Sequence, residues 1–270
     1  MLRIEWEYSF GNNMYHFIIA KLLSKKYNMQ LSFTNDSRWT KVKDVSKKHA
    51  KILTDPVEYI NHLNLDLKYY PENKPRINLT DESQLKNINE KYDYVLTRTN
   101  SWNFFKKEEF IKNIDEIKSW FPAIKEKNNK DLVVHARLGK DFYRKNRVPD
   151  FNVMKNLIDD LEYEKIYICT DSPEDSYIEN FKNLGKECIV VSKGTRECDL
   201  KTGYFLNEVK SDLIIDDFNF IRSFDKILLT SPNSTFAFLS AALSDAKFVK
   251  FDLDKAMKTS RGWFAHELFK

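Results

Sequence analysis

The chain has 270 residues, of which 42% are hydrophobic and 31% charged, and its formal net charge is +4. This size and composition suit a globular protein of two domains and exclude disordered and fibrous classes. The 44 basic residues are interleaved with 40 acidic residues rather than clustered. A nucleic-acid-binding face is therefore disfavoured, and we expect no nucleic acid partner.

Three cysteines, Cys169, Cys188 and Cys198, occur without a CxxC pair, which argues against a disulfide framework and against structural zinc. No apolar run approaches the roughly 18 residues of a membrane span. Residues 1–10 also lack the apolar core of a signal peptide. The sequence therefore predicts a cytoplasmic protein without a membrane span.

In the first half of the chain, short apolar segments alternate with amphipathic ones. A turn over residues 9–13 separates the first strand from the first helix; it contains Gly11 and Asn12 and could present a helix N-terminus to an anion. A tight turn that needs glycine is the alternative interpretation. The sequence predicts strands over 2–8, 29–33 and 92–97, and helices over 14–27, 56–63 and 104–121.

The second half alternates strand and helix more regularly, which predicts a parallel, doubly wound sheet. The polar stretch 122–130 suggests a domain boundary, so we expect domains over residues 1–128 and 129–270. Predicted strands cover 131–135, 165–169, 188–192, 226–230 and 248–251, and predicted helices cover 152–161, 174–184, 211–223, 235–243 and 254–269.

Three loops that follow strands of the second half lie at one edge of such a sheet and carry polar groups. They are HARLGKDF after residue 134, CTDSPE after 168 and TSPNSTF after 229. Arg137 can bind phosphate oxygens with two N–H groups, the helix that begins near Thr235 offers N–H groups to an anion, and Asp171 can accept hydrogen bonds from a base or ribose. This set suits a nucleotide diphosphate.

Other phosphate-binding motifs are absent from the sequence. Without GxxxxGK[ST] a P-loop ATPase is excluded, and the GxGxxG fingerprint is missing too. No DxD occurs in these three loops, so a metal-held diphosphate is disfavoured. We expect neither a metal nor another cofactor, with Arg137 stabilising the leaving group instead.

Several stretches together resemble the fucosyltransferase superfamily, both α1,2-fucosyltransferases and protein O-fucosyltransferases. HARLGKDF is similar to their HxRxGxDW and HxRRGDY stretches, YICTDSPE to the following strand with TD, NSTFAF to the NSSFSWW helix start, and GNNMY to an N-terminal GNQMF turn. The order and spacing match over nearly the whole chain. The resemblance implies an α/β protein of GT-B fold, with two Rossmann-like domains, a cleft between them and a terminal helix that can pack back on the N-terminal domain.

The resemblance also implies an activity and a set of site residues. The expected enzyme is an inverting, metal-independent glycosyltransferase that moves L-fucose from GDP-fucose onto a glycan hydroxyl, with a nucleotide sugar and a glycan acceptor as partners. Arg137 would bind the β-phosphate, and His135 and Asp171 would contact the nucleoside. The remaining donor-binding positions are Gly11, Asn12, Gly139, Ser234, Thr235 and Phe236.

Three departures from the family pattern affect donor sugar and acceptor. Leu138 replaces a second arginine, Lys140 precedes the acid, and Phe238 with Leu239 replaces a tryptophan pair. A transferase for another nucleotide sugar, such as xylose or rhamnose, and a catalytically silent binding module therefore remain as alternatives. Nucleic-acid binding through the basic loops 38–51 and 140–147 ranks last.

The general base that takes the acceptor proton must be a carboxylate or histidine within hydrogen-bond reach. Asp141, which follows the first loop, is our first candidate, and His16 and Glu7 are the others. Each also has an ordinary interpretation, since loop aspartates are mostly solvated and a helical histidine is commonly a core or surface residue.

Overall fold

The computed structural model describes residues 1–5, 10–34, 60–61, 63–71, 73–104, 106–139, 147–193, 211–231, 233–256 and 269. The chain divides into an N-terminal unit, Met1–Pro122, and a C-terminal unit, Ala123–Lys270. Our predicted boundary after residue 128 lies instead inside strand β5 (Asn128–Ala136), because that strand begins within the polar stretch that we interpreted as a linker.

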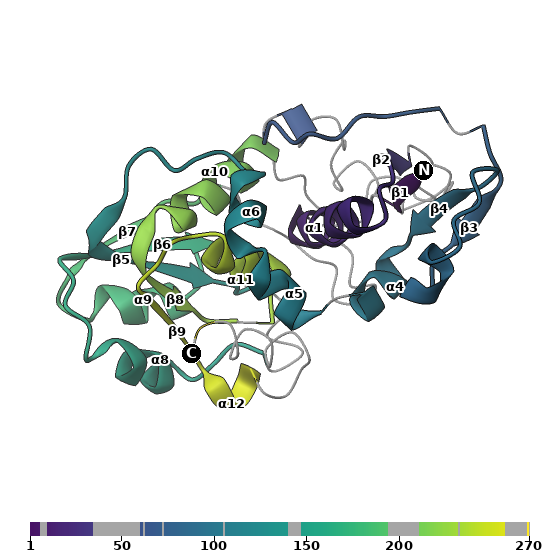
Figure 1. The fold of residues 1–270 in the computed structure, drawn as a ribbon. Helices are drawn as coiled ribbons and strands as arrows, with labels where there is room; N and C mark the ends of the chain where they lie inside the picture. The colour runs from purple at the N-terminus through teal and green to yellow at the C-terminus, as the bar shows by residue number, and fades with distance from the viewer. Residues whose placement is uncertain are drawn as a thin grey trace, which may run out of the picture. The chain divides into compact units, whose positions relative to one another are not determined.

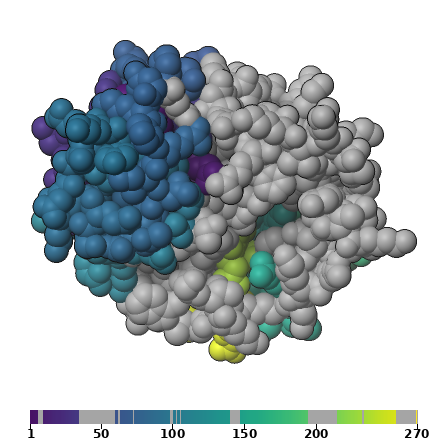
Figure 2. Space-filling model, turned by 90° about the vertical axis from the view of Figure 1, so that its right-hand side faces the viewer, coloured from purple at the N-terminus to yellow at the C-terminus, as the bar shows by residue number. Residues whose placement is uncertain are grey.

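The N-terminal unit contains a parallel four-stranded sheet in the order β2-β1-β4-β3. The apolar side chains of β1, Leu2 and Ile4, are fully buried, as is most of helix α1. In the view of Figure 2, the blue segment after residue 60 forms most of this unit's coloured surface, and little of the purple N-terminal segment is visible. The elements are β1 (Leu2–Glu5), α1 (Phe10–Lys26), β2 (Leu31–Thr34), β3 (Arg76–Asn78) and β4 (Asp93–Leu96).

The predicted turn over residues 9–13 is wrong at its C-terminal side, because α1 begins at Phe10. Phe10 and Met14, one helical turn apart, are 1% and 0% exposed. The apolar face of the helix thus begins four residues earlier than the predicted start at Met14, and it places Gly11 and Asn12 in the first helical turn. Gly11 is therefore helical and does not serve a tight turn.

Residues between β3 and the unit's end form short elements where we predicted longer or irregular ones. The predicted helix 104–121 is two helices that meet at Asn113, whose side-chain amide donates to the Glu109 carbonyl at 2.6 Å; such local bonding competes with helix continuation. The elements are η2 (Glu82–Leu85), a 3₁₀ helix with a capping box from Asp81 and Gln84, α4 (Arg98–Ser101), η3 (Trp102–Phe104), α5 (Lys107–Lys112) and α6 (Ile114–Ser119).

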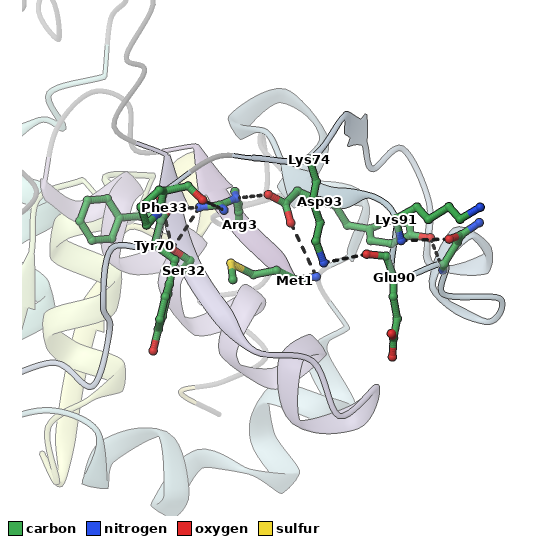
Figure 3. A network of polar contacts seen from close by, with 12 residues as sticks. Met1, Arg3, Ser32, Phe33, Tyr70, Lys74, Glu90, Lys91 and Asp93 are labelled. Atoms are coloured by element: carbon green, nitrogen blue, oxygen red, sulfur yellow. Dashed lines mark hydrogen bonds and ion pairs between the residues drawn. The ribbon is translucent and has the colours of Figure 1, made fainter.

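A buried arginine joins three parts of this unit (Figure 3). Arg3 of β1 is 0% exposed, and its Nε donates to Asp93 Oδ2 on β4 at 2.7 Å. Its Nη1 and Nη2 donate to the carbonyls of Tyr70 and Pro71 at 2.7 and 3.0 Å, and Nη1 also lies 3.3 Å from Ser32 Oγ on β2. The guanidinium therefore fixes the segment around residue 70 to the sheet.

The C-terminal unit contains a parallel five-stranded sheet in the order β7-β6-β5-β8-β9 (Figure 1). Helices α8 and α9 cover one face over Leu132, Val134 and Ala136, and α10 and α11 cover the other over Val133 and Cys169. The elements are β5, α8 (Phe151–Ile158), β6 (Lys165–Thr170), α9 (Tyr177–Lys182), β7 (Glu187–Val190), α10 (Ser211–Arg222), β8 (Phe224–Leu229), α11 (Thr235–Ala242), β9 (Phe248–Phe251) and α12 (Leu253–Ala256).

The structure confirms the predicted α/β class with two Rossmann-like, all-parallel units. Most of the predicted helix 254–269 lies outside the described residues, apart from α12 and Phe269. Phe269 packs within the C-terminal unit, with its ring centroid 6.3 Å from that of Phe238 and 6.2 Å from that of Phe251. Among the described helices, none has the length and apolar character that crossing a membrane requires.

The buried Arg3–Asp93 pair predicts a large, specific loss of stability. Asp93→Asn leaves the guanidinium buried without its counter-charge, and we expect the free energy of unfolding to fall by about 3–5 kcal/mol. Urea unfolding followed by circular dichroism measures this loss. The matched control is Glu116→Gln, which breaks an exposed ion pair with Lys25 and should cost less than about 1 kcal/mol. Equal losses in the two variants would contradict the assigned role of the network.

Candidate active site

The sheet of the C-terminal unit has a topological switch point beside its central strand. β5 pairs with β6 on one side and with β8 on the other, so the chain winds away from β5 in both directions. Ligands of open α/β sheets bind outside the carboxyl ends of the strands at such a point. The residues that follow β5 and β8 therefore form the candidate site, and they belong to two of the three loops selected from the sequence.

The loop after β5 is held by acceptors from the two neighbouring strands. The Arg137 N–H donates to Thr230 Oγ1 at 3.2 Å, and the N–H groups of Leu138 and Gly139 donate to Asp171 Oδ1 at 2.8 and 3.2 Å. On the β8 side, the Thr230 N–H donates to the His135 carbonyl at 3.1 Å. These bonds replace the sheet partners that the backbone loses where β5 ends.

The guanidinium of Arg137 forms an ion pair with Asp171, because its Nη1 donates to Asp171 Oδ2. Both side chains are 12% exposed, so the pair is largely screened from water but not sealed from it. The structure thus brings together Arg137, Gly139 and Asp171, three of the predicted donor-binding residues, in one contiguous cluster.

His135 is a neutral imidazole at physiological pH. It lies on the face covered by α10 and α11, is 6% exposed, and packs against Phe236 with ring centroids 5.2 Å apart. Burial, aided by the charge of Arg137 and opposed by that of Asp171, lowers the pKa of His135 to about 4. The imidazole can therefore form hydrogen bonds with a ligand but adds no positive charge to the site.

The start of α11 lies next to these groups through Phe236. Ser234 is the N-cap residue, yet its side chain makes no capping hydrogen bond; its N–H donates to the Ser231 carbonyl at 3.0 Å. Among the described residues, two buried polar atoms at this edge, Ser231 Oγ and His135 Nδ1, have no hydrogen-bond partner. Buried polar atoms are nearly always paired, so a partner from a ligand or from another part of the chain is expected for both.

A further carboxyl near this edge escaped the sequence analysis. The Ser192 hydroxyl, just after β7, accepts from the Thr170 N–H at 2.8 Å and donates to Asp217 Oδ2 on α10 at 2.5 Å. Burial raises the pKa of Asp217 to about 6, with Asp216 adding to the rise and the Ser192 hydrogen bond opposing it. No sequence signal predicts this contact, because Asp217 belongs to an amphipathic helix pattern far from Ser192 along the chain.

The other predicted site residues belong to the N-terminal unit or lie outside the described residues. Gly11 and Asn12 are in the first turn of α1, in the N-terminal unit. His16 of the same helix is 1% exposed, so it is poorly placed to meet an acceptor hydroxyl in solvent. Asp141 and Glu7 lie outside the described residues, and their proposed role as base stays a prediction.

No group of three or more His, Cys, Asp or Glu side chains within the described part of the chain is arranged to hold a metal ion. Cys169 is fully buried in β6, and burial raises the pKa of its thiol. Its role in the described structure is packing against α10 and α11.

The shifted pKa values of His135 and Asp217 have opposite effects on how the stability of the protein depends on pH. As pH falls from 6.5 to 4, unfolded chains protonate His135 and the folded protein does not, so the folded state loses stability. Over the same window folded Asp217 gains a proton before the unfolded group does, so stability rises. In Asp217→Asn the second effect is gone, and we expect its free energy of unfolding to fall by about 2 kcal/mol more than that of wild type between pH 6.5 and 4.5.

Denaturant unfolding of both proteins at half-unit pH steps measures this difference. Asp254→Asn removes an exposed carboxylate of α12 and serves as the control, with a pH profile parallel to that of wild type. Parallel profiles for Asp217→Asn and wild type would refute a raised pKa at Asp217.

Comparisons with known proteins assign no family. No protein-family model and no curated protein matches the sequence. Similar solved structures include a NodZ alpha-1,6-fucosyltransferase soaked with GDP-fucose (12% identity, TM-score 0.49, covering 94% of this chain and 96% of that chain) and NodZ fucosyltransferase from Bradyrhizobium (14% identity, TM-score 0.48, covering 94% and 95%). At these identities and TM-scores the likeness establishes neither a family nor an activity for this chain.

Proposed function

We propose that the protein is a glycosyltransferase that binds a nucleotide-diphosphate sugar at the carboxyl edge of β5 and β8. The observation that carries the proposal is the Arg137 guanidinium, held by Asp171 at a topological switch point. The sequence resemblance makes GDP-fucose the first donor to test and a glycan hydroxyl the acceptor. Xylose and rhamnose donors are alternatives within the same class.

The charges of the site favour a diphosphate over an uncharged ligand. A guanidinium presents a planar set of N–H donors that matches phosphate oxygens, and a helix N-terminus carries about half a positive charge. His135 is neutral because its pKa is lowered to about 4, so the positive contribution comes from Arg137 and the first turn of α11. Thr235 and Phe236 lie in that turn, next to the N-cap Ser234.

The proposed reaction is a single displacement at the anomeric carbon of the sugar. The acceptor oxygen forms the new bond as a base takes its proton, and the bond between the anomeric carbon and the β-phosphate oxygen breaks. Negative charge then develops on the leaving GDP, where Arg137 and the α11 N–H groups stabilise it. Such a displacement inverts the anomeric configuration, and cationic protein groups take the place that a metal ion would have. Asp141 is the base that we propose.

The first test is calorimetric titration with GDP, UDP and GDP-fucose, each with and without EDTA. We expect GDP to bind the wild type, and Arg137→Ala to weaken GDP binding at least about tenfold, since a charge-assisted hydrogen bond contributes about 1.5–3 kcal/mol. The control Lys165→Ala also removes one positive charge, but at the first residue of β6, at the opposite edge of the sheet. It should bind GDP as the wild type does.

Other results would revise the proposal in defined ways. Binding of UDP without GDP would keep the transferase class and overturn the fucose assignment. Loss of binding on adding EDTA would overturn metal independence, and no binding of any nucleotide would favour a silent carbohydrate-binding module. Where GDP-fucose is consumed with an acceptor glycan, the anomeric proton coupling in the product's NMR spectrum distinguishes inversion from retention.

A further inference from the structure

The carboxylate of Asp171 makes its hydrogen bonds within the protein. It accepts three hydrogen bonds, from the N–H groups of Leu138 and Gly139 on Oδ1 and from Arg137 Nη1 on Oδ2. A carboxylate has about four acceptor positions, so most of the capacity of this group is already used. This differs from the role expected from the resemblance, in which Asp171 contacts the nucleoside.

The three bonds fix one short loop by both its backbone and its side chain. Leu138 is 1% exposed and belongs to the core cluster under α8 and α9. Its packing there also anchors the loop. Asp171 holds the backbone on either side of that anchor and also holds the guanidinium. The direction in which Arg137 points is therefore set by Asp171, whereas the strand alone fixes only the position of its Cα.

We propose that Asp171 is a positioning residue for phosphate recognition: by holding the Leu138–Gly139 backbone and the guanidinium, it orients Arg137 toward the diphosphate, and it does not read the nucleoside. This inference rests on the proposed function, because it needs a diphosphate at Arg137. It divides the site into a phosphate-binding part, which depends on Asp171, and a nucleoside-binding part, which does not.

An opposite effect competes with positioning. A carboxylate beside a guanidinium also neutralises it, so removal of the carboxylate could strengthen anion binding through simple Coulomb attraction. The pair is only 12% exposed, and three hydrogen bonds hold the geometry. We therefore expect the loss of orientation to outweigh the gain of free charge, since a fixed guanidinium binds oxygens with two N–H groups and a mobile one does not.

The experiment separates the two parts of the ligand. Dissociation constants of inorganic pyrophosphate and of guanosine are measured by calorimetry and ligand-observed NMR for the wild type and for Asp171→Asn. We expect pyrophosphate binding to weaken about ten- to a hundredfold and guanosine binding to stay within about twofold. In the Arg137→Ala background, Asp171→Asn should have little further effect on pyrophosphate, because residues that act as a unit are non-additive.

Asp175→Asn is the matched control, because it removes the same charge from the same connection between β6 and α9, where the carboxylate accepts from the Tyr177 N–H at 2.9 Å. It should leave both affinities unchanged. If Asp171→Asn does not fold, Asp171→Glu, which keeps the charge and displaces it, should weaken pyrophosphate binding and spare guanosine.

Three results would overturn the inference while the wild type still binds GDP. These are weaker guanosine binding with unchanged pyrophosphate binding, tighter pyrophosphate binding in Asp171→Asn, and full additivity of the two substitutions. A wild type that binds neither pyrophosphate nor GDP would instead refute the proposed function.

Discussion

The backbone N–H groups of residues 137 to 139 lose their sheet partners where β5 ends, and the site depends on how they are satisfied. Their acceptors come from both sides of the switch point, Thr230 from the β8 side and Asp171 from the β6 side. β5 itself cannot move to accommodate them, because Leu132, Val133 and Val134 are 0% exposed with helices over both faces. The strand is rigid and hydrogen bonds hold the following loop from both sides, so the backbone position of Arg137 is fixed. Precise recognition of an anion requires such a fixed position.

Some buried polar atoms at this edge of the sheet lack hydrogen bonds, which fits a binding site. Burial of an unpaired polar atom costs about 1–3 kcal/mol, yet His135 Nδ1 and Ser231 Oγ are both left without partners. The buried Arg3 of the N-terminal unit, by contrast, makes four hydrogen bonds. The two atoms at the switch point are therefore available to a ligand that binds at this edge.

The sequence predicted the class of fold and the main loops of the site because both depend on local signals. Apolar runs identify strands, and the predicted strand 248–251 matches β9 at both ends. The sequence-based predictions were wrong where tertiary or side-chain contacts set the bounds of a helix. Phe10 packs into the core, so α1 begins earlier than predicted, and the Asn113 side chain interrupts the predicted helix 104–121. The Ser192–Asp217 hydrogen bond joins residues 25 positions apart, and no periodicity or motif records such a pair.

The positions at which the sequence departs from the fucosyltransferase pattern are mostly core positions in this structure. Leu138 is 1% exposed under α8 and α9, and Phe238 and Leu239 are 4% and 0% exposed on α11. A hydrophobic side chain at these places satisfies packing, so the replacements have a cause within the unit and need no change of ligand to account for them. Under the proposed function, differences in donor sugar or acceptor come from residues that face the ligand, and the proposed phosphate-binding loop, with Arg137 and Asp171, is compatible with any nucleotide-diphosphate sugar.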